Sequence, residues 1–133
     1  MALADYDEVI ALWRSTEGIG LSASDERAAV GVYLARNPGM SFVAVAGGRI
    51  VGAVLAGHDG RRGCLHHLAV LPSCRRRGIG GALVGAALAR LAAAGIPKCN
   101  LFLFDQNADG RVFWQRHGWS SRGDLVVMQK PLA

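Results

Sequence analysis

Apolar side chains near the start of the chain recur at the three- and four-residue spacing of an amphipathic helix. The positions that share one helical face are Tyr6, Val9, Ile10 and Trp13. Asp5 and, three residues later, Glu8 form a capping pattern at the start of this helix. Gly18 ends the helix. A second helix is predicted from about residue 24 to residue 36, because Pro38 disfavours helical backbone just before it.

The pattern then changes to short apolar runs separated by glycine and proline, which is typical of strands. Residues 41–46 and 49–57 flank a Gly-Gly pair and predict a hairpin with a tight turn. A third strand is predicted over residues 64–71, and Pro72 ends it. These three strands are expected to form the start of one sheet.

Helices and strands alternate in the remainder of the chain. The alanine-rich stretch 78–94 predicts a helix that closes at Gly95, and residues 98–104 predict the next strand. A short helix over 107–118 and a final strand over 124–130 complete the order. This order predicts an α/β (α+β) fold, in which a mixed sheet carries helices on both faces and all 133 residues form one domain.

The composition is that of a globular protein with a core, because 51% of the residues are hydrophobic. No apolar run reaches the length of a membrane span, and no charged-then-apolar secretory start is present. The cysteines, Cys64, Cys74 and Cys99, are far apart and odd in number, so we expect reduced thiols. We therefore expect a cytoplasmic protein without a disulfide frame or a bound metal.

The net charge of +5 is unevenly distributed along the chain. Residues 1–60 contain four basic and seven acidic side chains, whereas residues 61–133 contain eleven basic and three acidic ones. The basic half includes three consecutive arginines, Arg75, Arg76 and Arg77. The expected partner is anionic: a phosphate-bearing cofactor, nucleic acid or an acidic protein. A solvated basic surface is the simplest alternative.

The arginines stand between a predicted strand and a predicted helix, in the stretch LHHLAVLPSCRRRGIGGALVGAALARL. A helix start of this kind presents unpaired backbone N–H groups and the positive end of the helix dipole to an anion. Gly78, Gly80 and Gly81 lack a Cβ and permit close approach, and the arginines add charge. The sequence therefore predicts a phosphate-binding loop here.

Two common nucleotide-binding patterns do not fit this loop. A Walker loop requires a lysine followed by serine or threonine, which the loop lacks. A dinucleotide fingerprint requires a third glycine where Leu83 stands and an acidic residue about twenty positions later, in the region of Lys98. Both of these nucleotide-binding interpretations therefore fail.

The pattern that fits is Arg75-x-x-Gly78-x-Gly80, preceded by LAVLP and followed by an aliphatic helix. It resembles motif A of the GNAT superfamily of N-acetyltransferases, whose consensus is Q/R-x-x-G-x-G/A. The segment NADGRVFWQRHGW, residues 107–119, resembles the second motif of that family. Two helices before a hairpin also match the family's order of elements, so the resemblance covers nearly the whole chain.

The resemblance implies the GNAT fold, a mixed and mostly antiparallel sheet with a splayed parallel strand pair, and acetyl-coenzyme A as acyl donor. Leu68, Ala69 and Val70 would line the pantetheine arm, which Asn107 would also contact. Arg75 begins the motif, and the residues implied around the pyrophosphate are Arg76, Arg77, Gly78, Ile79, Gly80 and Gly81. Because four residues precede Asp5, the family's first strand is expected to be short or missing, leaving an edge exposed or covered by a partner chain.

Amine acylation requires a neutral amine, a donor for the oxyanion and a leaving thiolate. The resemblance implies a tyrosine acid where Trp114 stands, and in some members a glutamate base where Phe102 stands. His66 is the expected base, favoured over His67 because adjacent strand residues face opposite ways and the family's bases on this strand share its side. Asp105 is a second candidate base, and a structural role is the alternative for each.

The acceptor amine is expected to bind between the first two helices and their connection, STEGIGLSASD, where Glu17 is the candidate for holding an ammonium group. The resemblance implies an N-acetyltransferase that acts on a primary amine of a small molecule or a protein N-terminus. A non-catalytic acyl-coenzyme A binding or sensing module is the alternative, because the tyrosine and the glutamate are absent. We expect no nucleic acid, since aromatic residues do not interleave the arginines, and no membrane partner; a homodimer remains open.

Overall fold

A computed structural model describes all 133 residues of the protein. Two compact units make up the chain, Met1–Phe102 and Leu103–Ala133. The helices are α1 (Tyr6–Ser15), α2 (Arg27–Arg36), α3 (Ile79–Ala93) and α4 (Ala108–Arg116). The strands are β1 (Phe42–Ala46), β2 (Arg49–His58), β3 (Gly63–Val70) and β4 (Cys99–Leu101), and short 3-10 turns are η1 (Leu3–Asp5), η2 (Ala23–Asp25) and η3 (Pro72–Cys74).

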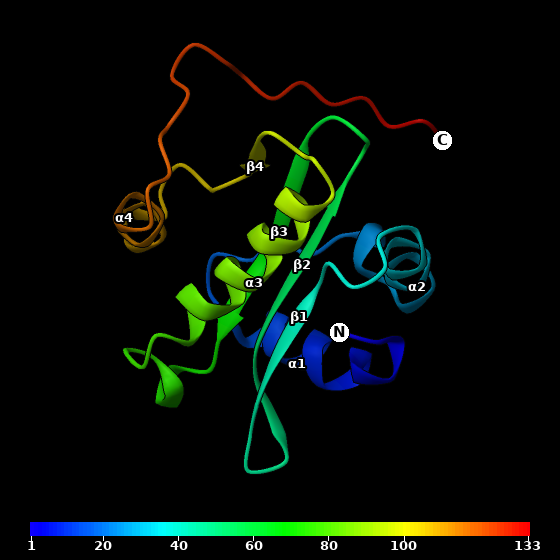
Figure 1. Cartoon of the computed structure of the whole chain (residues 1–133), viewed down its shortest axis with the longest axis vertical. Helices are drawn as coiled ribbons and strands as arrows, with labels where there is room; N and C mark the ends of the chain where they lie inside the picture. Colours follow the sequence, from blue (N-terminus) through cyan, green and yellow to red (C-terminus); the bar gives the residue numbers. More distant parts are fainter. The chain divides into compact units, whose positions relative to one another are not determined.

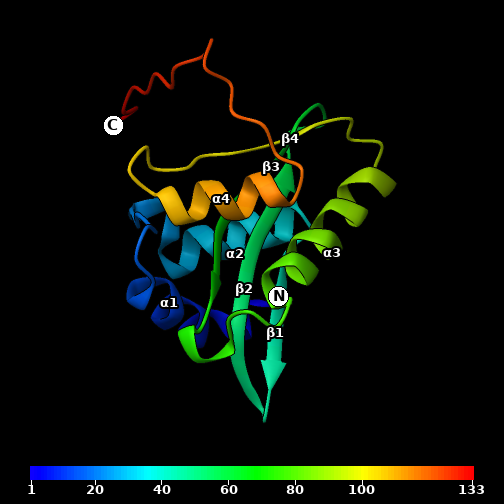
Figure 2. The same ribbon diagram turned by 90° about the vertical axis from the view of Figure 1, so that its left-hand side faces the viewer.

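One four-stranded sheet in the order β1-β2-β3-β4 forms the centre of the first unit. The first three strands are antiparallel, and β4 runs parallel to β3. Helices α1 and α2 lie on one face of the sheet and α3 lies on the other (Figures 1 and 2). The mixed sheet with helices on both faces is therefore confirmed.

Residues 1–5 form no strand before α1, as the sequence predicted. Residues Leu3–Asp5 form the turn η1 instead, and the terminal ammonium of Met1 donates a hydrogen bond to the Ser41 carbonyl oxygen at 2.7 Å. Strand β1 is consequently an edge of the sheet. Val45 on this strand is 61% exposed, so the edge is open over at least part of its length.

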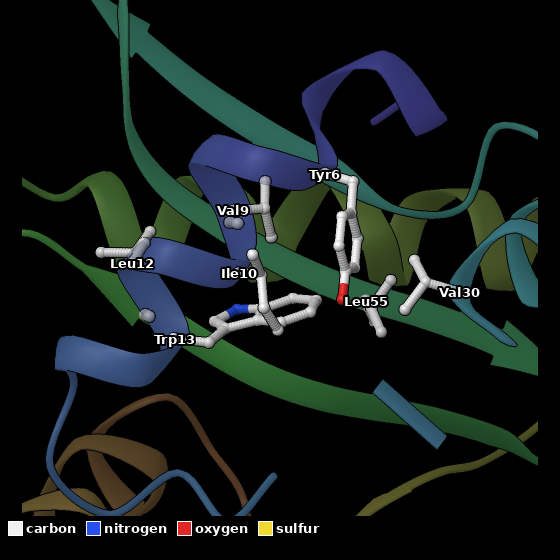
Figure 3. Packing of buried hydrophobic residues seen from close by; sticks show 9 residues of the cluster. Tyr6, Val9, Ile10, Leu12, Trp13, Val30 and Leu55 are labelled. Carbon is white, nitrogen blue, oxygen red and sulfur yellow. The ribbon is translucent and has the colours of Figure 1, made fainter. Parts of the chain in front are cut away.

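The predicted apolar face of α1 packs onto the sheet. Val9 and Trp13 have no solvent exposure, and they share a core cluster with Ala53, Leu55 and Ala69 from β2 and β3. Figure 3 shows the Tyr6 ring of α1 beside Leu55 and Val30, and the Trp13 ring beneath Ile10. Burial of a Val, Leu or Ile side chain contributes roughly 1.5–3 kcal/mol, so this cluster holds α1 firmly to the sheet.

Helix α3 approaches the other face closely because two strand positions are glycines. A Cβ on Gly52 would lie 3.0 Å from Leu83 Cδ1, and a Cβ on Gly63 would lie 2.9 Å from Leu91 Cδ1. Both leucines are buried, one at each end of α3. The leucine contacts fix the start of α3 beside the end of β3, where the arginine-rich loop joins them.

Strand β3 contains a bulge and separates from β4 at the same level. The register with β2 shifts between Ala53 and Leu55, opposite residues 66–69 of β3, and His67 has a positive φ of 55°. Parallel pairing with β4 ends at Leu65 opposite Leu101. The splayed parallel pair is thus confirmed, and the strand predicted over 98–104 is shorter than expected because β3 diverges from it.

The second unit consists of α4 and the segments around it. Asn107 caps α4 through a hydrogen bond from the Gly110 N–H to Asn107 Oδ1, 2.9 Å, as predicted. The final strand predicted over 124–130 is wrong, because those residues pair with no strand and their apolar side chains are exposed, Val126 at 85%. A strand forms only where its backbone N–H and C=O groups can pair with a neighbouring strand, and an apolar side-chain pattern alone does not supply that neighbour.

Candidate active site

The loop between β3 and α3 leaves the first turn of a 15-residue helix open to an anion. Gly78 occupies the N-cap position with φ 77°, a left-handed conformation that favours glycine, and no side chain caps the helix. The first turn of α3 carries no acidic side chain. Its backbone N–H groups and the helix dipole therefore face a site without competing negative charge.

Three exposed arginines flank this helix start. Arg75, Arg76 and Arg77 take part in no ion pair, so their charges are available to a ligand. The Arg75 Nε donates a hydrogen bond to the Val70 carbonyl oxygen at 3.2 Å, and Arg76 has a positive φ of 62°. Folding of the loop thus directs one arginine back toward the end of β3.

Beyond Leu65, strand β3 pairs with β2 alone, so its opposite edge carries unpaired backbone groups. An extended ligand with amide groups can bind such an edge as a further strand would. The side chain of Ala69 is 3% exposed and belongs to the core, so only its backbone can meet a ligand. Leu68 and Val70 are half-buried.

These features fit a phosphorylated ligand with an extended amide-bearing arm. The phosphate end has the open helix start and the free guanidinium groups, and the arm has the open edge of β3. Coenzyme A has this chemistry. All the cofactor residues expected before Leu103 therefore come together at one corner of the first unit.

His66 and His67 lie on the same side of the sheet, which corrects the expectation that adjacent residues face opposite ways. Their ring centroids are 6.2 Å apart; His66 lies 5.9 Å from the Tyr33 ring and His67 lies 5.0 Å from the Trp13 ring. The bulge at His67 breaks the two-residue alternation of the strand. Both histidines consequently face the layer of α1 and α2.

His67 is bonded to a buried carboxylate that comes from a distant part of the chain. Its Nε2 lies 2.7 Å from Asp25 Oδ1. Asp25 is 7% exposed, its Oδ2 accepts a hydrogen bond from the Ser22 N–H at 2.9 Å, and its carbonyl oxygen accepts one from Tyr6 Oη at 2.7 Å. The carboxylate is therefore held rigidly beneath the imidazole.

Sequence reasoning missed Asp25 as a site residue. The capping pattern Ser22-x-x-Asp25 was present in the chain and could have fixed the turn η2, in which both reciprocal capping hydrogen bonds form. It could not have located the partner, because 42 residues separate Asp25 from His67.

The environment of His66 differs from that of His67. Burial lowers the pKa of His66 below its ordinary value, the neighbouring His67 lowers it further, and Asp25 opposes both effects. The His66 ring makes no hydrogen bond, and its aromatic neighbour Tyr33 has a hydroxyl whose pKa is raised, chiefly by burial. His66 is thus a half-buried, neutral group near pH 7.

An open pocket of about 250 Å³ lies between α1 and the connection to α2. Its lining combines apolar, basic and acidic side chains: Tyr6, Ile10, Arg14, Leu21, Ser22, Asp25 and Glu26. The pocket lies where the acceptor site was expected, but Glu17 is not among its lining residues. The acidic residues that line it are Asp25 and Glu26.

Asp105, Asn107 and Trp114 belong to the second compact unit. Asp105 Oδ1 lies 3.3 Å from Arg111 NH2, and its side chain is almost fully exposed. Trp114 is half-buried, with its ring 5.1 Å from the rings of both Phe113 and Trp119. Within this unit, Asp105 forms a surface ion pair and Trp114 forms part of an aromatic cluster.

Other titratable groups give no second site. The three cysteines are free thiols, and burial raises the pKa of Cys64 and brings that of Cys99 to about 11. No group of three or more His, Cys, Asp and Glu side chains is arranged to hold a metal ion. None of the helices is both long and apolar enough to span a bilayer.

Comparisons with known proteins agree with this geometry. The sequence profile of the Acetyltransferase (GNAT) family matches residues 6–119. An acetyltransferase of Sodalis glossinidius (strain morsitans) is 35% identical over 128 residues, which cover 96% of this chain and 89% of that protein. An acetyltransferase of Yersinia enterocolitica is likewise 35% identical over 129 residues, covering 97% and 90% of the two chains.

A solved structure of similar fold is AAC(6')-Iy in complex with a bisubstrate analog, CoA-S-monomethyl-acetylneamine. It has a TM-score of 0.78 at 20% identity and covers 98% of this chain and 95% of its own. Identity at this level shows the fold alone. The present chain therefore has a fold already seen in a solved structure.

Proposed function

Because the chain belongs to the GNAT acetyltransferase family, we propose that it is an N-acetyltransferase that uses acetyl-coenzyme A to acetylate a primary amine. The acceptor is a small molecule or a protein N-terminus. One observation carries the proposal: an uncapped, arginine-flanked helix start adjoins the unpaired edge of β3. The helix start suits the phosphate end of a ligand, and the adjoining strand edge suits the amide arm of the same ligand.

In this proposal the loop and the strand bind different parts of the acyl donor. Arg76, Arg77 and the N–H groups at the start of α3 hold the pyrophosphate, and the backbone of residues 68–70 holds the pantetheine arm. Arg75 shapes the loop through its bond to Val70 and adds charge. When bound, acetyl-coenzyme A supplies a thioester carbonyl that a neutral amine can attack.

The pocket beside Asp25 and Glu26 is the proposed entrance for the acceptor. Two carboxylates at its lining favour a cationic ammonium group, and Arg14 on the opposite helix favours an acceptor that also carries a negative or polar group. The AAC(6')-Iy complex contains an analog that joins coenzyme A to an acetylated amine, which supports an amine acceptor in this fold.

A non-catalytic acyl-coenzyme A binding or sensing module is the second candidate. It is favoured by Trp114 and Phe102, which stand where the family often has an acid and a base. Both candidates require coenzyme A to bind, so a binding measurement cannot distinguish them. Release of free thiol from acetyl-coenzyme A in the presence of an amine distinguishes the enzyme from the binding module.

The test is direct. Coenzyme A and acetyl-coenzyme A should raise the melting temperature, because a ligand that binds only the folded state stabilises it. Fragments that lack the pyrophosphate should raise it much less. Thiol release is then followed with acetyl-coenzyme A and three amines: neamine, spermidine and a peptide with an N-terminal alanine. Absence of a thermal shift at millimolar coenzyme A would overturn the proposal, and a shift without thiol release would favour the binding module.

A further inference from the structure

We propose that His67, oriented by Asp25, is the general base that deprotonates the acceptor amine. This inference rests on the proposed acetyl transfer and replaces His66, the base expected from the strand pattern. Asp25 is a positioning residue in this proposal, because it acts through the imidazole.

The hydrogen bond to Asp25 decides which nitrogen of His67 is free. An ionised carboxylate only accepts hydrogen bonds, and Asp25 already accepts one from the Ser22 N–H at its other oxygen, Oδ2. Nε2 of His67 therefore carries the hydrogen that points at Asp25 Oδ1, 2.7 Å away. Nδ1 then holds a lone pair, and no group in the protein bonds to it. This nitrogen is the one available to take a proton.

The backbone at His67 lies in the left-handed region of φ. Its φ of 55° is uncommon outside glycine, and the bulge turns its imidazole to the side of Asp25 and Trp13. Such conformations carry strain and gather at functional sites. Trp13 adds a second unusual feature, since its Nε1 is the one buried side-chain polar atom without a hydrogen-bond partner.

The position of His67 along β3 suits the acyl end of the donor. With the pyrophosphate at the loop after β3, an arm that runs back along the open edge passes Val70 first and residues 66 and 67 last. At about 3.3 Å per residue, His67 lies roughly 10 Å back from Val70. Asp25 also lines the proposed acceptor pocket, which His67 itself does not line, so the imidazole is bonded to a residue of the pocket wall.

His66 is less suited to the same role. No hydrogen bond orients its ring, and burial and the neighbouring imidazole lower its pKa. The groups that face His67 are the Asp25 carboxylate from η2 and the His66 imidazole from β3, with neutral Trp13 from α1. Arg14 and Glu26 line the pocket that Asp25 shares. Of these groups, the Asp25 carboxylate is the acidic one in direct contact with the imidazole of His67.

Nδ1 of His67 takes one proton from the ammonium group of the acceptor, and the freed nitrogen lone pair forms a bond to the thioester carbonyl carbon. The carbon–sulfur bond then breaks, and the sulfur leaves as thiolate. That thiolate takes the second proton lost by the nitrogen, while His67 gives its proton to solvent. The products are the N-acetylated amine, coenzyme A and one proton.

The experiment compares His67→Gln with His66→Gln, and uses His58→Gln at the far end of β2 as a matched control. Turnover is measured against pH with acetyl-coenzyme A and the acceptor that the wild type uses best, and coenzyme A affinity is measured by calorimetry. We expect His67→Gln to lower kcat about 10²-fold with little change in coenzyme A affinity, and to remove the limb of the pH profile that rises with pH. His58→Gln should leave both quantities within about twofold.

Two further measurements distinguish a catalytic role of His67 from a purely structural one. The 15N shifts of His67 in the intact protein should show the hydrogen on Nε2, independently of any turnover, and Asp25→Asn should weaken that preference if it folds. A folded His67→Gln variant with turnover within about threefold of wild type, a larger loss in His66→Gln, or a hydrogen on Nδ1 would overturn the inference. Failure of the wild type itself to release thiol with any amine would instead reject the proposed function, and this inference with it.

Discussion

The guanidinium of Arg75 donates from Nε to the carbonyl oxygen of Val70, the last residue of β3, at 3.2 Å. The bond closes the turn between the strand and α3 and gives one of the three arginines a fixed direction. Arg76 and Arg77 have no comparable anchor. Arg75 therefore contributes both positive charge and loop shape, whereas Arg76 and Arg77 contribute charge alone. Substitutions at these positions can consequently test the two contributions separately.

Arg75→Lys keeps the positive charge and removes the Nε donor. A single hydrogen bond contributes about 0.5–1.5 kcal/mol, so the Kd for coenzyme A is expected to rise by about twofold to thirteenfold. Calorimetric titration measures this change, with Arg90→Lys at the opposite end of α3 as the control. An unchanged Kd in Arg75→Lys would mean that the bond to Val70 plays no part in shaping the loop.

Gly78→Ala should weaken both stability and coenzyme A binding. The residue has φ 77°, where a side chain costs about 1–2 kcal/mol, and it sits at the N-cap that the phosphate would approach. Urea unfolding and a coenzyme A thermal shift measure the two effects.

Gly85→Ala is the matched control, because it lies within α3 and a Cβ there meets no atom within 4 Å. It should raise the free energy of unfolding by about 0.5–1 kcal/mol and leave binding unchanged. If both alanine variants behaved alike, the left-handed conformation at Gly78 would not matter to the site.

The elements that could be predicted from the sequence are those with local causes. The apolar face of α1, the hairpin of β1 and β2 and the glycine at the start of α3 each depend on a few adjacent residues. The loop that binds phosphate in our proposal belongs to this class, because its glycines and arginines act within seven positions of the chain.

The features that could not be predicted depend on distant partners. No glycine or proline marks the bulge at His67, so simple alternation assigned its side chain to the wrong face. Asp25 reaches His67 only through the packing of η2 against the sheet. Residues 124–130 have the pattern of a strand, yet strand formation requires a neighbour that the local sequence does not specify.

His66 should make the protein less stable in mild acid. Burial lowers its pKa in the folded state below the ordinary value of 6.5, so the unfolded chain binds the proton more readily. This contribution to the free energy of unfolding is therefore complete above about pH 6.5 and is lost as pH falls through the lowered pKa. Urea unfolding between about pH 8 and pH 5 measures it.

His66→Gln cannot take up this proton and should flatten the pH dependence. The comparison is the slope of unfolding free energy against pH in the variant and in the wild type, since the other histidines are common to both. Equal slopes would show that protonation of His66 does not differ between the folded and unfolded states.

Trp114→Tyr should raise turnover. The family resemblance puts an acid at this position, which protonates the leaving thiolate, whereas an indole N–H donates a hydrogen bond but does not transfer its proton near neutral pH. General acid catalysis contributes roughly 10²–10⁴-fold when it acts in the transition state, so we expect kcat to rise by tenfold or more. Affinity for coenzyme A should change little, because the pyrophosphate contacts in our proposal come from the loop before α3.

Trp119→Tyr makes the same chemical change in the same aromatic cluster, 5.1 Å away, and is the control for altered packing. It should leave kcat at or below the wild-type value. If Trp114→Tyr folds and binds coenzyme A but is no faster than wild type, the leaving thiolate must obtain its proton elsewhere. The ammonium proton of the acceptor would then suffice, because a thiol with a pKa of about 8.5 is a tolerable leaving group without an acid. Protonation of the leaving thiolate would in that case not limit the rate, and His67→Gln should lower kcat equally in the wild-type and Trp114→Tyr backgrounds.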